Sequence, residues 1–285
     1  MKVISCIYKV LNLMRPKKIV NVNISSMTPN ELLKGRCALI TGGTSGIGFS
    51  IAEAFLNSGA SVIITGRSQE RIDAALAKFP KGKLFGIVLD NTKVDSFEGK
   101  FAEMVEIVKA EGIPIIDILV NNAGVNGKGM PNATEDEYDK ILDTNLKGTF
   151  FLSQMFGKYF VRNGIKGNIL NIASASSLRP ADSAYSVTKW GIRGLTLGLA
   201  KALGKNGITV NGIAPGPTST PMLIKRGDSN MSLERIPLGR YIMPEEIANI
   251  AVILVSDMSR SIMGELIFMT GGAANLTYDD VKYGF

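Results

Sequence analysis

Residues 37–48 of this chain read CALITGGTSGIG, a short apolar run that ends in a glycine-rich turn. The run over 37–41 predicts a buried strand, and apolar residues at helical spacing over 47–57 predict the helix that follows. Glycines at such a turn let the backbone approach a pyrophosphate, which then lies at the N-terminus of the helix. The spacing is Thr-Gly-x-x-x-Gly-x-Gly rather than the commoner G-x-G-x-x-G, so it is the position between the first strand and the first helix that predicts a dinucleotide site.

Apolar runs alternate with longer stretches of helical period along the rest of the chain. Most runs are continuously apolar, as expected of strands buried on both faces of a sheet. Strict alternation predicts a parallel sheet with helices on both faces, joined by right-handed crossovers. We therefore expect one doubly wound α/β domain over 35–285, preceded by an extension over 1–34. The expected strands are 37–41, 61–65, 84–89, 115–120, 168–173, 209–213 and 265–269, and the expected helices are 47–57, 70–78, 97–111, 135–163, 184–206 and 244–256.

Composition excludes several classes of site. The 285 residues include no histidine, which removes Ser-His-Asp and Cys-His catalysis and every zinc site that needs histidine, and we expect no metal. Cys6 and Cys37 lie far apart, and nothing suggests an oxidising compartment, so we expect a cytoplasmic protein. The net charge of +7 is spread without a long basic block or a basic aromatic stripe, so we expect no nucleic-acid binding.

Residues 1–18 carry apolar side chains at helical spacing among basic ones. The apolar stretch is too short to span a membrane, and no clear signal-peptide cleavage site follows it. Two interpretations stay open: a basic amphipathic helix that lies on a membrane surface or in a partner's groove, or a loosely held leader.

The end of the second expected strand indicates the choice of cofactor. An acidic residue there would bind the adenosine ribose 2′-hydroxyl and repel a 2′-phosphate. Gly66 stands in that place, and Arg67 follows it with a guanidinium that suits a phosphate. This favours NADP(H) over NAD(H), although Arg67 could also be a solvated turn residue.

Two further strand ends carry candidate cofactor residues. Asp90-Asn91 follows the third expected strand, where a carboxylate and its neighbour could meet an adenine ring. Asn121-Asn122-Ala123-Gly124 closes the fourth, and its small and amide side chains fit the close passage of a ribose. Taken alone, each of these two motifs would be typical of an ordinary turn.

The constellation most specific for catalysis is Tyr185-Ser186-Val187-Thr188-Lys189, with Ser174 eleven residues before the tyrosine. Tyrosine and lysine four apart lie on one face of a helix. A phenol has a pKa of about 10, and a nearby ammonium lowers that pKa and makes proton exchange feasible. Ser174 could hydrogen-bond a substrate oxygen as charge develops there. In isolation, a Tyr-Lys pair on a helix is usually exposed and without a role.

Together these motifs resemble the short-chain dehydrogenase/reductase family over about residues 35–272. The resemblance implies a Rossmann-type fold with a seven-stranded parallel sheet and one active site at the carboxyl ends of the strands. It also implies a loop beside the nicotinamide at residues 215–220. The cofactor-binding residues that it implies are Thr41, Gly42, Thr44, Ser45, Gly46, Ile47, Gly48, Arg67, Asp90, Asn91, Asn121, Ala123, Gly124, Tyr185, Lys189, Pro215, Gly216, Thr218 and Thr220.

The resemblance also implies catalytic roles. Tyr185 would be the acid/base, and Lys189 would hold the nicotinamide ribose and lower the pKa of the tyrosine. Ser174 would orient the carbonyl, and Asn145 would kink its helix and support a proton-relay water. Two departures are visible: Thr270 stands where the family usually has Asp, and the Ser-to-Tyr interval is about two residues short. Ser176 and Ser177 stay as minor alternatives to Ser174.

Residues 222–240 should form the substrate lid. The runs 236–240 and 244–248 resemble the 3-oxoacyl-carrier-protein reductase branch, and a basic surface suits an acidic carrier protein. A thioester carried on acyl carrier protein or CoA is thus the first expectation. Sugar, polyol or steroid dehydrogenases are the alternatives, and a catalytically silent nucleotide-binding regulator is a rival of another class. Family members usually assemble through helices such as 135–163 and 184–206, so we expect a homotetramer or a dimer.

Overall fold

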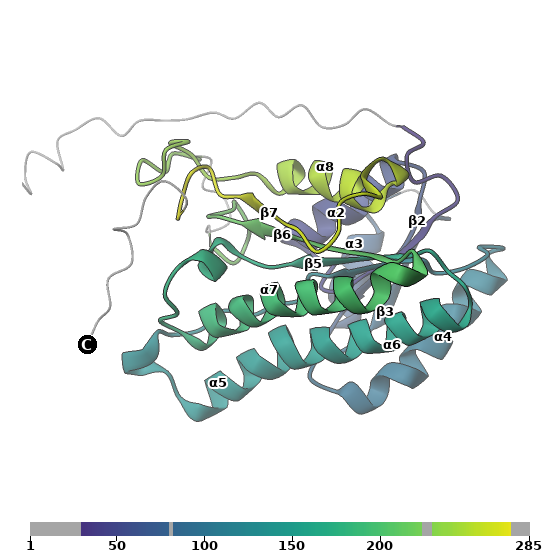
Figure 1. The fold of residues 1–285 in the computed structure, drawn as a ribbon, viewed down its shortest axis with the longest axis horizontal. Helices are drawn as coiled ribbons and strands as arrows, with labels where there is room; N and C mark the ends of the chain where they lie inside the picture. Colours follow the sequence, from purple (N-terminus) through teal and green to yellow (C-terminus); the bar gives the residue numbers. More distant parts are fainter. Residues whose placement is uncertain (1–29, 80–81, 224–229, 275–285) are drawn as a thin grey trace, which may run out of the picture.

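The computed structural model describes residues 30–79, 82–223 and 230–274 (Figure 1). Its described part forms a seven-stranded sheet in the order β3-β2-β1-β4-β5-β6-β7, and every adjacent pair is parallel. The expected doubly wound α/β fold is confirmed. The strands are β1 (Cys37–Ile40), β2 (Ser61–Gly66), β3 (Leu84–Val88), β4 (Ile118–Asn121), β5 (Asn168–Ile172), β6 (Thr209–Pro215) and β7 (Leu266–Met269).

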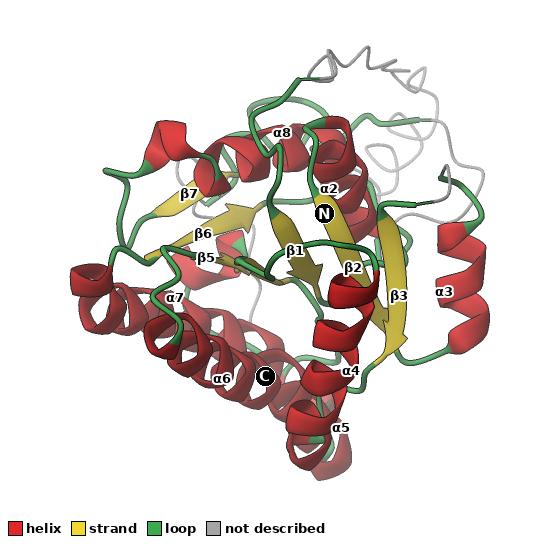
Figure 2. Cartoon of the chain, turned by 90° about the vertical axis from the view of Figure 1, so that its right-hand side faces the viewer, coloured by secondary structure: helices red, strands yellow, loops and turns green. Residues whose placement is uncertain are grey.

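Helices cover both faces of this sheet, as Figure 2 shows. Alternate residues of a strand point to opposite faces, and β1 shows why two cores form. Ala38 and Ile40 belong to the core beneath α2 and α8, whereas Cys37 and Leu39 belong to the core against α4, α6 and α7. The helices are α2 (Gly46–Asn57), α3 (Gln69–Leu76), α4 (Phe97–Ala110), α5 (Glu135–Leu142), α6 (Gly148–Arg162), α7 (Ala184–Leu203) and α8 (Pro244–Val255).

The stretch expected as one helix over 135–163 is divided by a π-helical turn at Asp143–Lys147. Asn145 lies in this turn and directs its side chain toward the loop after β4, where it bonds both the N–H and the carbonyl of Val125. Single π-turns inside α-helices often occur at functional sites. The helix changes its geometry at the residue for which the resemblance implied a kink.

The packed domain begins before residue 35. Leu33 is 0% exposed, and its N–H donates to the carbonyl of Ser58 at 2.8 Å. The predicted extension over 1–34 therefore overlaps the domain at its end, while the amphipathic pattern over 1–18 lies outside the described residues. Across the described ranges, no helix has the length and apolar character needed to cross a membrane.

Candidate active site

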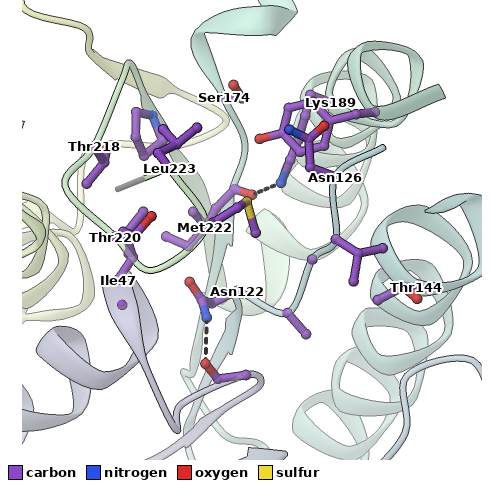
Figure 3. Close-up of a pocket in the computed structure, with 18 of the residues that line it drawn as sticks. Ile47, Asn122, Asn126, Thr144, Ser174, Lys189, Thr218, Thr220, Met222 and Leu223 are labelled. Atoms are coloured by element: carbon purple, nitrogen blue, oxygen red, sulfur yellow. Dashed lines mark hydrogen bonds between the residues drawn. The ribbon is translucent and has the colours of Figure 1, made fainter. Parts of the chain in front are cut away.

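A cavity of about 1010 Å³ opens where the carboxyl ends of the strands meet the N-termini of α2 and α7 (Figure 3). Ligands of open parallel sheets bind at this edge. Figure 3 shows the loop with Thr218 and Thr220 across the cavity from Lys189. Most of the predicted site residues line it: Gly42, Thr44, Ser45, Gly46, Ile47, Arg67, Asp90, Asn91, Ala123, Gly124, Ser174, Tyr185, Lys189, Pro215, Gly216, Thr218 and Thr220.

The glycine-rich turn is shaped by close backbone contacts. Gly42 and Gly46 have φ values of +65° and +56°, which L side chains rarely adopt. A Cβ on Gly48 would lie 2.4 Å from Nδ2 of Asn122 and 2.6 Å from the carbonyl oxygen of Gly42. Because Gly48 has no Cβ, the Asn122 amide has room to donate to the carbonyls of Thr41 and Gly42, at 2.9 and 3.1 Å. The turn after β1 is thereby tied to the end of β4.

Three residues predicted to touch a cofactor lie behind the cavity wall instead. Thr41 is fully buried, and its Oγ1 accepts from the N–H groups of Asn122 and Ala123, both at 3.0 Å. Gly48 provides the space for Asn122, and Asn121 donates to Ser153 and Asn171 within the core. Thr41, Gly48 and Asn121 thus shape the cavity wall from behind, and their direct contact with a cofactor stays a prediction.

Two guanidinium groups, from the loop after β2 and the first turn of α3, lie at one end of the cavity. Arg67 and Arg71 line the cavity with Thr44 and Ser68, and no carboxylate occupies residues 66–68. Ser68 caps α3 by accepting from the N–H of Arg71 at 3.4 Å, so the cap places Arg71 one turn beyond Arg67. The sequence analysis missed Arg71, although the i, i+4 spacing of two arginines at a helix start was its signal.

Two residues after β3 complete this end of the cavity. The Asp90 carboxylate accepts from the N–H and the hydroxyl of Thr92, both at 3.0 Å. Asn91 is buried, lines the cavity, and has an Nδ2 atom with no partner among the described residues. A buried amide without a partner is costly unless a ligand satisfies it. With the left-handed glycines, this fits the binding of a dinucleotide.

The acid/base candidates lie together at the other end. Ser183 caps α7 by accepting from the N–H of Ser186, so that Tyr185 occupies the first turn and Lys189 the next. Lys189 is buried, donates to the carbonyl of Ile172 at 2.8 Å, and lies 5.4 Å from the centre of the Tyr185 ring.

Burial governs the pKa values of this pair. Desolvation raises the pKa of Tyr185 above its ordinary value, and a hydrogen bond with Ser174 offsets part of that rise. Desolvation also lowers the pKa of Lys189 to about 8. Burial therefore raises the pKa of Tyr185 overall, because the cost of burying a phenolate outweighs the other contributions, and the expected lowering by Lys189 stays a prediction. The phenol of Tyr185 is therefore protonated at neutral pH.

Position in the cavity bears on the choice between the candidate serines. Ser174 lines the cavity at the end of β5, and its hydroxyl acts to lower the pKa of Tyr185. Ser177 is fully buried and donates to the carbonyl of Ser174 at 2.8 Å, so it braces the turn. Ser176 lines the cavity with its Oγ 3.2 Å from that of Ser174. The geometry favours Ser174.

Asn145 does not line the cavity with the other catalytic candidates. Its Oδ1 accepts from the N–H of Val125 at 2.8 Å, and its Nδ2 donates to the Val125 carbonyl and to Thr188 at 2.9 and 3.3 Å. Both polar atoms of the side chain are thus engaged. Asn145 thereby fixes the loop after β4 against α7, and its support of a proton-relay water stays a prediction.

Thr270 takes part in the turn that follows β7. Its Oγ1 accepts from the N–H of Gly272 at 3.2 Å, and a Cβ on Gly216 would lie 2.8 Å from its carbonyl oxygen. Thr270 therefore closes the turn after β7 against the loop that follows β6.

Within the predicted lid, Met222, Leu223 and Arg235 line the cavity, and residues 224–229 lie outside the described ranges. Across the described part of the chain, no three acidic, cysteine or histidine side chains come together as a metal site.

Known proteins match this chain over nearly the same residues as the resemblance seen in the sequence. The family model described as enoyl-(acyl carrier protein) reductase matches residues 42–274. A 3α-hydroxysteroid dehydrogenase of Mediterraneibacter gnavus is 36% identical over 253 residues, which are 85% of this chain and 98% of that protein. A crystal structure of a short chain dehydrogenase from Burkholderia cenocepacia in complex with NADP has 31% identity and a TM-score of 0.74, over 85% of this chain and 99% of that one. This chain belongs to the short-chain dehydrogenase/reductase family.

Another relative indicates a different substrate within the family. A 3-oxoacyl-[acyl-carrier-protein] reductase of Thermotoga maritima is also 36% identical, over 248 residues that are 84% of this chain and 98% of that protein. As a short-chain dehydrogenase/reductase, the protein is an oxidoreductase that acts on CH–OH and C=O groups and uses a nicotinamide cofactor.

Proposed function

We propose that this short-chain dehydrogenase/reductase prefers NADP(H) and reduces a 3-oxoacyl thioester carried on acyl carrier protein or CoA. The observation that supports the cofactor preference is the pair Arg67, just after β2, and Arg71, in the first turn of α3, together with the lack of an acidic side chain at residues 66–68. Two guanidinium groups bind a phosphate better than a hydroxyl. The glycine-rich turn and Asn91 would hold the rest of the dinucleotide.

The nicotinamide, when bound, supplies the hydride for reduction or accepts it for oxidation. Tyr185 protonates the carbonyl oxygen, since its raised pKa keeps the phenol intact at neutral pH. Ser174 donates a hydrogen bond to the same oxygen and stabilises the charge that develops there. Asn145 positions the loop of Val125 beside them.

Lys189 keeps its charge in this scheme up to a pH of about 8. Its ammonium favours the phenolate that remains on Tyr185 after proton transfer, and it would also hold the nicotinamide ribose. The grouping of Ser174, Tyr185 and Lys189 in one cavity argues against a silent regulator, because nucleotide binding alone needs no acid/base.

The choice of a thioester is supported by the 3-oxoacyl-[acyl-carrier-protein] reductase relative and by the basic charge of the chain, which would attract an acidic carrier protein. The hydroxysteroid dehydrogenase relative has the same identity, so a steroid is the second candidate. Met222 and Leu223 give the cavity an apolar side that either carbon skeleton could contact.

A substrate panel tests this proposal. Purified protein is given NADPH or NADH with an acetoacetyl thioester, a 3-ketosteroid or a keto sugar, and cofactor oxidation is followed. Fastest turnover with NADPH and the thioester is expected. Preference for the steroid or the sugar would move the protein to that branch, and a preference for NADH would contradict the role of the arginine pair.

We also infer a homo-oligomer, a homotetramer or a dimer. Phe150 on α6 is 45% exposed and Leu197 on α7 is 55% exposed, and a shallow apolar groove of about 430 Å³ lies between these two helices. Burial of such a face against a second copy would remove apolar area from water. Location in the cytoplasm and membrane contact through residues 1–18 stay predictions.

A further inference from the structure

Two side chains of α7 just beyond Lys189 bond the segment that follows β5. The indole N–H of Trp190 donates to the carbonyl of Arg179 at 2.8 Å, and NH1 of Arg193 donates to the carbonyl of Ser177 at 3.0 Å. Neither Trp190 nor Arg193 lines the cavity. Their bonds end on the stretch that carries Ser174.

The same helix also holds the chain before Ser174. Lys189 donates to the carbonyl of Ile172 at 2.8 Å, two residues ahead of the serine. Lys189 and Arg193 are four apart and so share a face of α7. Main-chain oxygens on both sides of Ser174 are therefore bound to the helix that presents Tyr185.

The turn between these anchor points is braced from within. The carbonyl of Ser174 accepts from the N–H and the Oγ of Ser177, at 3.0 and 2.8 Å. The Oγ of Ser174 accepts from the N–H of Ser176 at 3.1 Å. A shift of the Ser177 carbonyl would therefore displace Ser174 as well.

Ring contacts fix the donors themselves. The guanidinium of Arg193 lies 5.3 Å from the centre of the Trp190 ring and 5.7 Å from that of Phe268 on β7. A guanidinium within about 6 Å of a ring face is attracted to it. Trp190 is 41% exposed, so packing in the core does not account for its place.

We propose that Trp190 and Arg193 are positioning residues that clamp the segment 174–179 to α7 and so set the distance between Ser174 and Tyr185. The inference rests on the proposed role of Ser174 at the reacting oxygen. Displacement of a catalytic group by about 1 Å can lower a rate by roughly a hundredfold, so two bonds that hold the segment matter for turnover.

The test uses the full chain and two variants that keep the packing. Trp190→Phe retains a ring against Arg193 and removes the indole donor. Arg193→Met retains an unbranched stem and removes the guanidinium that donates to Ser177. With NADPH and whichever panel substrate turns over fastest, we expect kcat to fall by about tenfold in each variant, with the KM for NADPH within about twofold of wild type. Lys201→Gln, exposed on the last turn of α7, is the matched control and should behave as wild type.

A double-mutant cycle separates positioning from a general structural effect. If Trp190 acts through Ser174, then Trp190→Phe added to Ser174→Ala should change kcat by less than about twofold. Equal losses in both backgrounds would contradict the proposal. If Ser174→Ala lowers kcat and Trp190→Phe does not, the clamp fails while the role of Ser174 stands. If Ser174→Ala itself has no effect, both fail.

Hydrogen–deuterium exchange supplies a measurement that needs no substrate. Amides of residues 174–179 should exchange several-fold faster in Trp190→Phe and Arg193→Met than in wild type or Lys201→Gln, because anchored carbonyls restrict the opening of this turn. Unchanged exchange in both variants would show that the bonds do not hold the segment and would overturn the clamp.

Discussion

At the residue scale, the buried ammonium of Lys189 gives the site a pH dependence that can be measured. Desolvation lowers its pKa to about 8, so the side chain is charged below that pH and neutral above it. The raised pKa of Tyr185 keeps the phenol protonated over the same range. In the proposed mechanism, loss of charge on Lys189 would remove the group that stabilises the phenolate formed by proton transfer.

We therefore predict that kcat/KM for carbonyl reduction is constant at lower pH and falls above a pH of about 8, by roughly tenfold for each further unit. Initial rates between about pH 6 and 10 at saturating NADPH would measure this. A profile that stays flat well past the Lys189 pKa would show that the charge of this lysine does not matter for turnover.

The arginine pair makes a prediction about cofactor choice. In Arg67→Leu/Arg71→Leu, the KM for NADPH should rise by about 10- to 100-fold, because hydrogen bonds to charged groups contribute roughly 1.5–3 kcal/mol. The KM for NADH, which has no 2′-phosphate, should change little. Lys109→Gln on the exposed side of α4 is the control for overall charge. Equal changes for both cofactors would refute recognition of the 2′-phosphate.

Residue identities could be predicted where a motif has a fixed spacing. Ser174, Tyr185 and Lys189 were found in this way, and they share one cavity. Arg193 was not, because its hydrogen bond to Ser177 spans 16 residues and depends on how α7 packs against the end of β5. Sequence spacing also could not show whether the burial of Tyr185 or the charge of Lys189 would dominate the pKa of the tyrosine.

At the element scale, the turn between β1 and α2 is held by contacts that a single methyl group would break. Gly48→Ala would place a Cβ 2.4 Å from Nδ2 of Asn122 and 2.6 Å from the Gly42 carbonyl. We predict a loss of about 1–3 kcal/mol in the free energy of unfolding, measured by chemical denaturation. Gly99→Ala in α4, where a Cβ meets nothing within 4 Å, should instead be neutral or stabilising. Equal stability of the two variants would contradict the close packing of this turn.

Element types were predictable from periodicity, whereas interruptions were not. All seven strands were expected in place, because continuous apolar runs identify strands buried on both faces. Periodicity alone predicted one helix over 135–163, and the π-turn at Asp143–Lys147 was indicated only by the kink that the resemblance implied at Asn145, whose partner Val125 lies twenty residues away. The fourth strand begins at Ile118 rather than 115, as pairing with β1 starts only there.

At the scale of the whole molecule, the apolar face of α6 and α7 predicts self-association. Light scattering after size-exclusion chromatography should give the mass of a tetramer or a dimer for wild type. Phe150→Asp should lower that mass, because an interface does not tolerate a buried unpaired charge. Met258→Asp, which changes a side chain 71% exposed elsewhere, is the control. A monomeric wild type would contradict the assembly.

The central claim is that Tyr185 transfers the proton in a reduction that depends on NADPH. The most direct test compares wild type with Tyr185→Phe, using NADPH oxidation for turnover and cofactor fluorescence for binding. Loss of turnover by at least about a hundredfold, with the Kd for NADPH within about threefold of wild type, is the predicted result. Turnover of Tyr185→Phe close to that of wild type would contradict the assignment of the acid/base and the mechanism built on it.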